Sequence, residues 1–159
     1  MKLKSTAALC AALFASTCVL AQVALGATPL EAQRAGILKD IRGNVRLLGS
    51  DGVSRPARAG DALAPIERIE TEPNAAAGVV LRDGTSLVVG PSSRLDLKEF
   101  HFDSTTRDGG ILISLVRGSL RMITGLIGKT QPDAVRVETP TATIGIRGTD
   151  FIVQADPAP

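Results

Sequence analysis

The stretch AGVVLRDGTSLVVGPSS, residues 77–93, places Asp83 and Gly84 between two runs rich in valine and leucine. β-Branched residues favour extended backbone, and Asp-Gly suits the positive φ angles of a two-residue type I′ turn. The stretch therefore predicts a β-hairpin that turns at Asp83 and Gly84 and ends at residues 90–93. The expected cross-strand pairs are Val80 with Leu87 and Val79 with Val88.

Hydrophobic residues N-terminal to this hairpin also recur at every second position, which is the period of a β-strand. In residues 36–52 the apolar residues of one parity are Ile37, Ile41, Val45 and Leu47. Because the turn residues Ser50-Asp51-Gly52 follow them, the pattern predicts a bent strand and then a turn. The next segment, residues 55–65, contains proline and a Gly-Asp step and is predicted to form a loop.

Residues 94–103, RLDLKEFHFD, alternate apolar and polar side chains, but the apolar parity changes between Leu97 and Phe100. Such a change indicates a β-bulge or a bend. A polar turn is expected over residues 103–110. The apolar run 111–125 is then predicted to form two strands divided at Arg117-Gly118-Ser119, and further strands are expected in residues 134–140 and 150–154.

These strands determine the predicted fold class. Outside residues 1–27 we find no amphipathic helix of about ten residues or more, and turn residues separate the strands at intervals of roughly 8 to 12 residues. The sequence therefore predicts an all-β fold of short antiparallel strands, arranged as a sandwich, a barrel or a solenoid-like module.

Residues 1–27 have the composition of a secretory signal peptide. A short basic stretch, MKLK, precedes a long uncharged run rich in alanine, and acceptable cleavage positions follow Ala21, Gly26 and Ala27. We expect this leader to be a helix that directs the chain to the periplasm and is removed. The alternative is an inner-membrane anchor formed by residues 5–27, because the run is nearly long enough to cross about 30 Å of hydrocarbon.

Removal of the leader would change the charge and the cysteine content. Cys10, Cys18, Lys2 and Lys4 all lie in it, so no cysteine remains and Lys+Arg falls from 18 to 16 against an Asp+Glu count of 16. The formal net charge is then zero, whereas nucleic-acid binding requires a basic surface. We therefore expect no nucleic-acid partner, and contact with a membrane only if the leader is retained.

The remaining residues show no convincing catalytic or metal-binding pattern. His101 is the single histidine and lies between Phe100 and Phe102, so its side chain is expected to point away from the core. Without cysteine and with one histidine, neither a Ser-His-Asp triad nor a zinc cluster is indicated. The aspartates next to glycine are explained by turns, although a pair of carboxylates brought together by the fold stays open as a glycosidase-like alternative. No catalytic residue, cofactor or metal ion is predicted.

Two loops imitate known ligand-binding motifs. GLIGKT, residues 125–130, resembles the end of a phosphate-binding P-loop, but Ile123 stands where the first glycine is required and Gln131-Pro132 follows in place of a helix. We expect a surface loop there. Residues 103–110 carry two aspartates but lack the ligand spacing of a calcium loop, so a solvated turn is expected.

TPTATIGIRGTDF, residues 139–151, changes its apolar parity twice, once at Pro140 and once at Gly148. We expect the chain to bend or bulge at each and to continue as a strand. Arg147 lies between these bends, close to Asp150. Its guanidinium group is predicted to hold a corner of the sheet together, and the alternative role is to bind a ligand carboxylate.

This stretch resembles the signature motif of the FecR domain family. Residues 79–89, the Gly60-Asp61 step and residues 69–71 are also similar to that family, and the resemblance extends over residues 36–153. The motif residues are expected to be structural, as is the hairpin turn Asp83-Gly84. These motif residues are Thr139, Pro140, Thr141, Gly145, Arg147, Gly148, Thr149, Asp150 and Phe151.

The resemblance implies an all-β periplasmic module without catalytic activity. In the best-known members this module belongs to a transmembrane anti-sigma regulator that relays a signal from an outer-membrane siderophore receptor. This sequence departs from them, since only Met1 to Lys4 precede the apolar run and the sequence ends at Pro159. We therefore expect an exported, stand-alone form of the domain, acting as a signal-sensing or protein-interaction module of the cell envelope.

The expected domain organisation is a leader (1–27), a polar linker (28–35), the β domain (36–154) and a proline-containing tail (155–159). Residues 150–154 are predicted to form an open sheet edge, which can pair with a strand of an envelope protein or of a second copy. Two alternative functions remain: a carbohydrate- or peptidoglycan-binding protein, disfavoured by the absence of Trp and Tyr, and a carboxylate-dependent hydrolase.

Overall fold

The computed structural model describes residues 34–156, and the predicted leader lies outside the described residues. The strands are β1 (Gly36–Arg42), β2 (Val45–Leu48), β3 (Ser54–Pro56), β4 (Ala62–Leu63), β5 (Arg68–Thr71), β6 (Ala76–Leu81), β7 (Ser86–Val89), β8 (Arg94–Phe102), β9 (Gly109–Ile123), β10 (Val135–Glu138), β11 (Thr143–Gly145) and β12 (Asp150–Ala155). A short helix, α2 (Leu126–Thr130), and a 3₁₀ turn (Pro132–Ala134) lie between β9 and β10. The predicted all-β class is confirmed.

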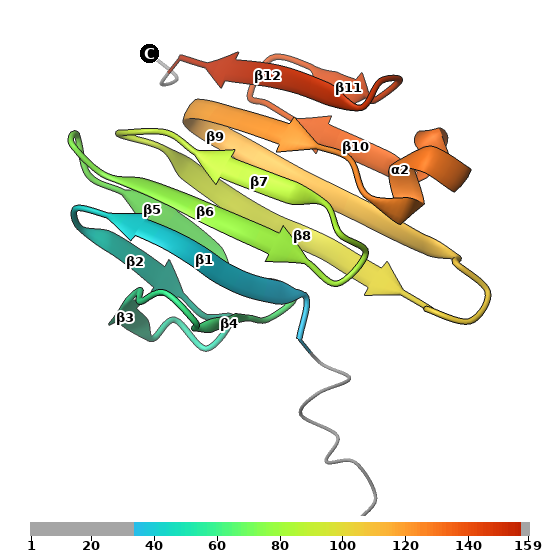
Figure 1. Ribbon diagram of the computed structural model, residues 1–159. Helices are drawn as coiled ribbons and strands as arrows, with labels where there is room; N and C mark the ends of the chain where they lie inside the picture. Colours follow the sequence, from blue (N-terminus) through green and yellow to red (C-terminus); the bar gives the residue numbers. More distant parts are fainter. Residues whose placement is uncertain (1–33, 157–159) are drawn as a thin grey trace, which may run out of the picture.

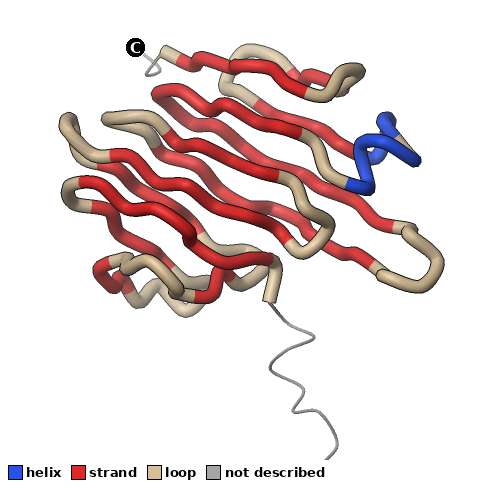
Figure 2. The backbone as a smooth tube through the Cα atoms, in the orientation of Figure 1, coloured by secondary structure: helices blue, strands red, loops and turns tan. Residues whose placement is uncertain are grey.

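The strands form a curled half-barrel in the order β3-β2-β5-β8-β9-β7-β6-β1-β4 (Figure 1). β9 is the central strand, and Figure 2 shows that it runs almost the full length of the sheet. Its first half pairs with β8 and β10, and its second half with β7 and β12. The β9–β10 pair is parallel, which differs from the prediction of antiparallel strands alone.

The predicted division of residues 111–125 into two strands is wrong, because β9 continues through residue 118. Gly118 has φ +91° and allows the strand to bend and change partners without ending. A Cβ atom there would lie 2.1 Å from Ser93 Oγ, so the segment that contains Ser93 packs directly on the backbone of Gly118. Glycine thus joins the two halves of the sheet where a break was expected.

The concave side of the curled sheet holds the hydrophobic core. Fully buried side chains come from the strands associated with both halves of β9 and include Leu38, Leu47, Leu63, Ile69, Leu87, Leu95, Ile113, Leu120 and Met122. Burial of each such side chain contributes roughly 1.5–3 kcal/mol relative to its exposure to water. Buried residues alternate with less buried ones in β5, β6 and β7, and of these strands β6 and β7 were predicted from the sequence.

The β6–β7 hairpin forms at the predicted residues but with a different turn. Only Gly84 has a positive φ (+84°), and Leu81 N–H donates to Thr85 O at 2.8 Å, so the loop holds three residues. Such loops combine a type I turn with a left-handed glycine. The predicted register is therefore wrong by one residue. The observed pairs are Val79 with Leu87 and Val80 with Ser86.

β-Bulges explain why the odd–even pattern of apolar residues predicted some strands correctly and others not. The predicted irregularity between Leu97 and Phe100 is confirmed, because the β8–β9 register shifts between Leu97 and Glu99. A second bulge, between Leu38 and Asp40 in β1, was not predicted. It buries Leu38 and leaves Ile37 on the outside, 38% exposed, contrary to the predicted parity. The expected single bent strand is two strands, β1 and β2.

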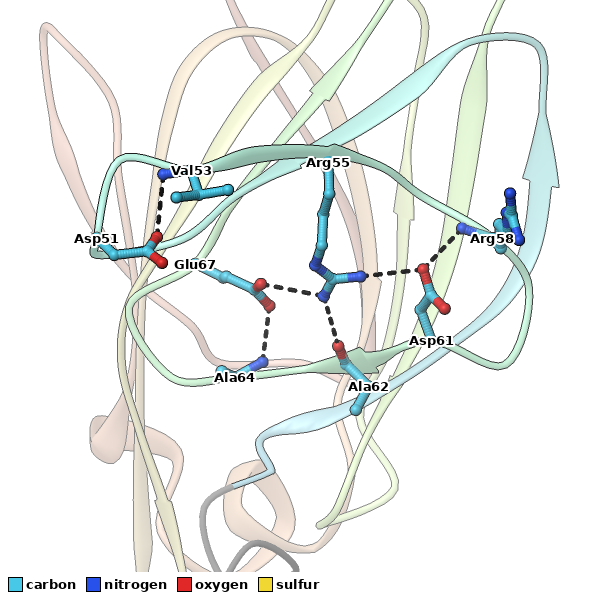
Figure 3. Close-up of polar contacts among 8 residues, drawn as sticks. All are labelled: Asp51, Val53, Arg55, Arg58, Asp61, Ala62, Ala64 and Glu67. Atoms are coloured by element: carbon cyan, nitrogen blue, oxygen red, sulfur yellow. Dashed lines mark hydrogen bonds and ion pairs between the residues drawn. The ribbon is translucent and has the colours of Figure 1, made fainter.

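The segment predicted as a loop, residues 55–65, contains β3 residues and β4, the two end strands of the sheet order. Arg55 on β3 joins them (Figure 3): its guanidinium donates to Asp61 Oδ2 at 3.0 Å, to Ala62 O at 3.1 Å and to Glu67 Oε1 at 3.1 Å. Glu67 also accepts a hydrogen bond from Ala64 N–H at 2.8 Å. Side-chain contacts thus close this end of the curled sheet.

Candidate functional site

The first half of the signature motif forms the β10–β11 hairpin. Thr139 Oγ1 accepts a hydrogen bond from Ala142 N–H at 3.1 Å, and Thr139 N–H donates to Ala142 O at 2.8 Å. Pro140 and Thr141 are exposed at the tip, and Gly145 is exposed on β11. The chain therefore reverses direction at Pro140, whereas the sequence predicted a bend within a continuing strand.

The second half of the motif carries the chain from β11 to β12. Gly148, with φ +149°, and Thr149 are held at the end of β9, where Thr124 Oγ1 donates to Gly148 O at 3.1 Å and Thr124 N–H donates to Thr149 O at 2.9 Å. Phe151 packs partly against the core and Val153 is buried. These contacts fix the start of β12 and its register on β9.

Asp150 pairs with Arg121 of β9. The guanidinium donates from Nε to Oδ1 at 3.1 Å and from Nη2 to Oδ2 at 2.7 Å. These hydrogen bonds lower the pKa of the Asp150 carboxyl group, and they raise the pKa of Arg121. The aspartate of the motif thus fastens β12 to β9 on the outer face of the sheet.

The predicted structural role of Arg147 is not observed. Its side chain is 83% exposed, and its nearest acidic contact is Asp133 Oδ1 at 3.8 Å, itself exposed. It therefore holds no corner of the sheet. It does line an open depression of about 620 Å³, together with Lys129 and Thr149, so binding of a ligand carboxylate stays a prediction. The guanidinium that does anchor the motif belongs to Arg121, which lies 26 residues earlier in the printed sequence and which no local pattern marks.

The hairpin turn Asp83-Gly84 positions helix α2. The buried Asp83 carboxylate accepts hydrogen bonds from Thr85 N–H at 3.0 Å and Thr85 Oγ1 at 2.6 Å, and Asp83 O accepts one from Leu126 N–H at 2.8 Å. Ile127 of α2 is fully buried. The prediction of a surface loop over residues 125–130 is therefore wrong, because the turn satisfies the first N–H groups of a short helix.

Strand β12 differs from the other strands that lie at an edge of the sheet within residues 34–156. β3 contains Pro56, β4 has two residues, and β11 has three. β12 has six residues without proline, lysine or glycine, and its register on β9 runs without a bulge. Natural sheets usually protect an edge by one of these devices. β12 is thus an edge strand that carries none of these three devices.

The backbone of β12 presents alternate residues to its open side. In an antiparallel ladder, residues that exchange hydrogen bonds with the neighbouring strand alternate with residues that do not. Because Thr149 O accepts from Thr124 N–H, the alternation assigns Phe151 and Val153 to the ladder with β9. The N–H and C=O groups of Asp150, Ile152 and Gln154 consequently point away from β9.

Apolar side chains cover the outer face beside this edge. Ile152 is 67% exposed, and Val88 and Ile123 on the adjoining strands are 45% and 42% exposed. The register places Val88, Arg121 and Ile152 in one row across β7, β9 and β12. Figure 1 shows β12 outside β9, at the side of the sheet opposite the closed end. The edge and these side chains form the candidate site, which we call the β12 edge (residues 150–155).

A groove of about 750 Å³ lies where β9 bends, and sequence reasoning did not find it. Its charged lining combines Arg46 and Arg117 with Glu70, Glu72 and Asp156. Residues from five separate segments meet there, so no local motif indicates it. Because both signs of charge are mixed, the groove favours no particular ligand charge.

The buried carboxylates of the described residues are engaged in structural contacts. They are Glu67, Asp83 and Asp96. Burial of Asp96 opposes its ionisation, but two hydrogen bonds and the charge of Arg68 outweigh this and lower the pKa of the Asp96 carboxyl group. A general acid would need the opposite shift. Residues 34–156 also bring no three His, Cys, Asp or Glu side chains together around a possible metal position.

The three described phenylalanines pack in or against the core, and His101 is exposed. Phe100 is buried, and Phe102 and Phe151 pack against the core, so they do not form an exposed platform for stacking a sugar ring. His101 points outward as predicted, with Nδ1 3.1 Å from Glu99 Oε1 and its side chain 62% exposed.

In the described residues no helix is both long and apolar enough to span a membrane.

Comparisons with known proteins give one family match. The family model described as FecR protein matches residues 67–159. A solved chain titled "Cell surface anchoring domain" has 24% sequence identity, with 40% of this chain and 83% of that chain covered and a TM-score of 0.39. A likeness of this size carries no argument about fold or function. The comparison with curated proteins found no match.

Proposed function

Since this chain belongs to the FecR protein family, we propose that its β domain is a non-enzymatic signal-sensing or protein-interaction module of the cell envelope. We further propose that residues 1–27 direct the chain to the periplasm, or that residues 5–27 anchor it to the inner membrane. In either case the β domain works outside the cytoplasm.

The β12 edge is the observation that carries this proposal. Its outward N–H and C=O groups offer a partner the hydrogen bonds of an additional strand, and the exposed Ile152 offers apolar contact. Strand addition of this kind obtains affinity from the main chain and specificity from alternate side chains. The module therefore acts by accepting an extended segment of another polypeptide.

The other described edges support this assignment. β3 and β4 are joined by Arg55, and β11 offers only three residues. A strand that docks on β12 also continues a sheet whose central strand, β9, is stabilised on both sides. Docking at β12 would thus extend a rigid scaffold and leave the core unchanged.

The experiment that tests this function is capture of a partner from an envelope extract by the purified chain. Gln154→Pro removes an outward N–H group without loss of a bond to β9, and Thr143→Pro on β11 is the matched control at the other edge. We expect a protein, identified by mass spectrometry, that binds again when purified, is lost with Gln154→Pro and is kept with Thr143→Pro. Equal binding by both variants would refute docking at β12.

A further inference from the structure

The identity of the docking strand can be inferred from the geometry of β12, and this inference rests on the proposed function. We propose that β12 pairs with β12 of a second copy of this chain, in an antiparallel alignment that places Ile152 opposite Ile152 of the second copy. The result is a two-fold symmetric dimer in which one sheet continues across both molecules.

The faces of the two strands restrict the register. Asp150, Ile152 and Gln154 carry exposed side chains, whereas Val153 and Ala155 are buried. A continuous sheet keeps exposed residues opposite exposed residues, because a slip of one residue turns every side chain to the other face. The residue that lies opposite its own copy is therefore Phe151, Ile152 or Val153, and we call it the centre of the alignment.

Backbone hydrogen bonding selects the centre on Ile152. In that alignment Asp150 lies opposite Gln154 of the second copy, Ile152 opposite Ile152, and Gln154 opposite Asp150. Each of these pairs exchanges two hydrogen bonds, since all three residues direct their N–H and C=O groups outward. A centre on Phe151 leaves Gln154 without a strand partner, and a centre on Val153 leaves Asp150 without one.

Side chains favour the same alignment. The most exposed large apolar side chain of the described residues, Ile152 at 67%, meets its own copy and is partly removed from water. Asp150 meets an amide and never another carboxylate, and its charge is already paired with Arg121 at 2.7 Å. Like charges directly opposite each other, which destabilise strand pairs, are thus avoided.

The overall charge also permits two copies to approach. Without Lys2 and Lys4 the chain has 16 basic and 16 acidic residues, which leaves no net repulsion between copies. The symmetry then limits the assembly. A two-fold contact uses the same edge on both molecules, and the Arg55 contacts close the opposite end of each sheet (Figure 3). We therefore expect dimers and no longer polymers.

The test combines sedimentation of the full chain with site-specific cross-linking, the latter in a chain that carries Cys10→Ser and Cys18→Ser so that an introduced cysteine is the only thiol. Residues opposite each other in a hydrogen-bonded pair have Cα atoms about 5.5 Å apart, within the range that a disulfide spans. Ile152→Cys is expected to form a disulfide-linked dimer under mild oxidation. Val88→Cys, which is exposed on the same face but lies inside the sheet, is the matched control and is expected to remain unlinked.

The second part of the test measures how Gln154→Pro changes the dimerisation constant. This substitution removes one outward N–H group from each copy, and the loss of two backbone hydrogen bonds is expected to weaken dimerisation about 30-fold. A parent chain that remains a monomer at every concentration would overturn self-pairing, and the proposed function would survive only if an identified envelope protein still binds through β12. A dimer that Ile152→Cys does not link would overturn the proposed alignment.

Discussion

Two residues, Arg55 and Gly118, determine how the sheet curls and how it bends. Arg55 replaces backbone pairing at the closed end, because one guanidinium reaches two carboxylates and the carbonyl oxygen of Ala62. Gly118 allows β9 to serve two halves of the sheet, since its φ of +91° is accessible to glycine and costly for other residues. Both residues act on shape, and neither is part of the β12 edge.

Gly118→Ala is expected to lower the free energy of unfolding by about 2–4 kcal/mol. The added Cβ would be strained at this φ and would collide with Ser93. Gly52→Ala is the matched control, because Gly52 also has a positive φ but no atom within 4 Å of the new Cβ. Urea unfolding measures both variants. Equal losses would show that packing against Ser93 is unimportant.

Arg55→Met is expected to lower the free energy of unfolding by roughly 1–3 kcal/mol, because it leaves the buried Glu67 without its cation. The control is Arg42→Met, whose side chain is 79% exposed and lies 3.6 Å from an exposed Asp40. That substitution is expected to change stability by less than about 0.5 kcal/mol. If both variants unfold at the same urea concentration, the closure at β3 and β4 does not stabilise the fold.

Asp96 provides a pH-dependent contribution to stability. Its folded pKa is lowered, despite burial, by hydrogen bonds from Arg68 at 2.5 and 3.0 Å. A lowered folded pKa gives stability that is present above the unfolded pKa of about 3.9 and is lost as the pH falls through the folded pKa. Asp96→Asn is therefore expected to destabilise by roughly 1–3 kcal/mol at pH 7.

Below about pH 4 this difference between parent and variant should begin to shrink, because Asp96 is then protonated in the unfolded chain, and it is lost once the pH falls below the lowered folded pKa. Urea unfolding at pH 7 and near pH 3 measures it. Asp133→Asn, at an 85% exposed carboxylate, is the control and should show little difference at either pH. A constant difference for Asp96→Asn would mean that the charge of Asp96 is not what stabilises the contact.

At the scale of elements, the alternation of β12 predicts different effects of proline at adjacent positions. Val153→Pro removes a bond of the β9 ladder and a buried side chain, with an expected loss of roughly 2–4 kcal/mol. Gln154→Pro removes only an outward N–H group, with an expected loss below about 1 kcal/mol. Unfolding at low protein concentration, where copies do not pair, compares them. A larger loss at residue 154 would reverse the assignment of the edge.

Elements whose signal is local could be predicted from the sequence. The Asp-Gly hairpin signal located β6 and β7, alternation located β8, and the parity change at Leu97 located the bulge in β8. The bulge in β1, the parallel pairing of β10 and helix α2 could not be predicted, because each depends on a distant partner. Asp83 shows the reason: it looks like an ordinary turn residue, yet its carbonyl group positions Leu126.

The candidate site was also predicted only in part. Residues 150–154 were expected to form an open edge, and β12 (Asp150–Ala155) lies at the edge of the described sheet. The anchor of that edge was assigned to the wrong arginine, since Arg147 is close in sequence and Arg121 is close in space. Proximity along the chain is a poor guide where two strands from distant segments meet.

At the scale of the whole molecule, the two ends of the half-barrel have different properties. Val53 and Ile66 are exposed at the β3–β4 end as Ile152 is at the β12 end, but the β3–β4 end is closed by side-chain hydrogen bonds, whereas β12 directs backbone groups away from the sheet. This asymmetry suits a module that accepts a strand at β12. We therefore expect association to leave the core and the closed end unchanged.

Amide hydrogen exchange, followed by NMR over a range of protein concentrations and with any identified envelope partner, tests the central claim that β12 is a docking edge. The account predicts that the amides of Asp150, Ile152 and Gln154 exchange rapidly in the dilute chain and become protected on association. Those of Phe151 and Val153 should be protected throughout. Rapid exchange at Ile152 and Gln154 in every associated state would contradict the claim.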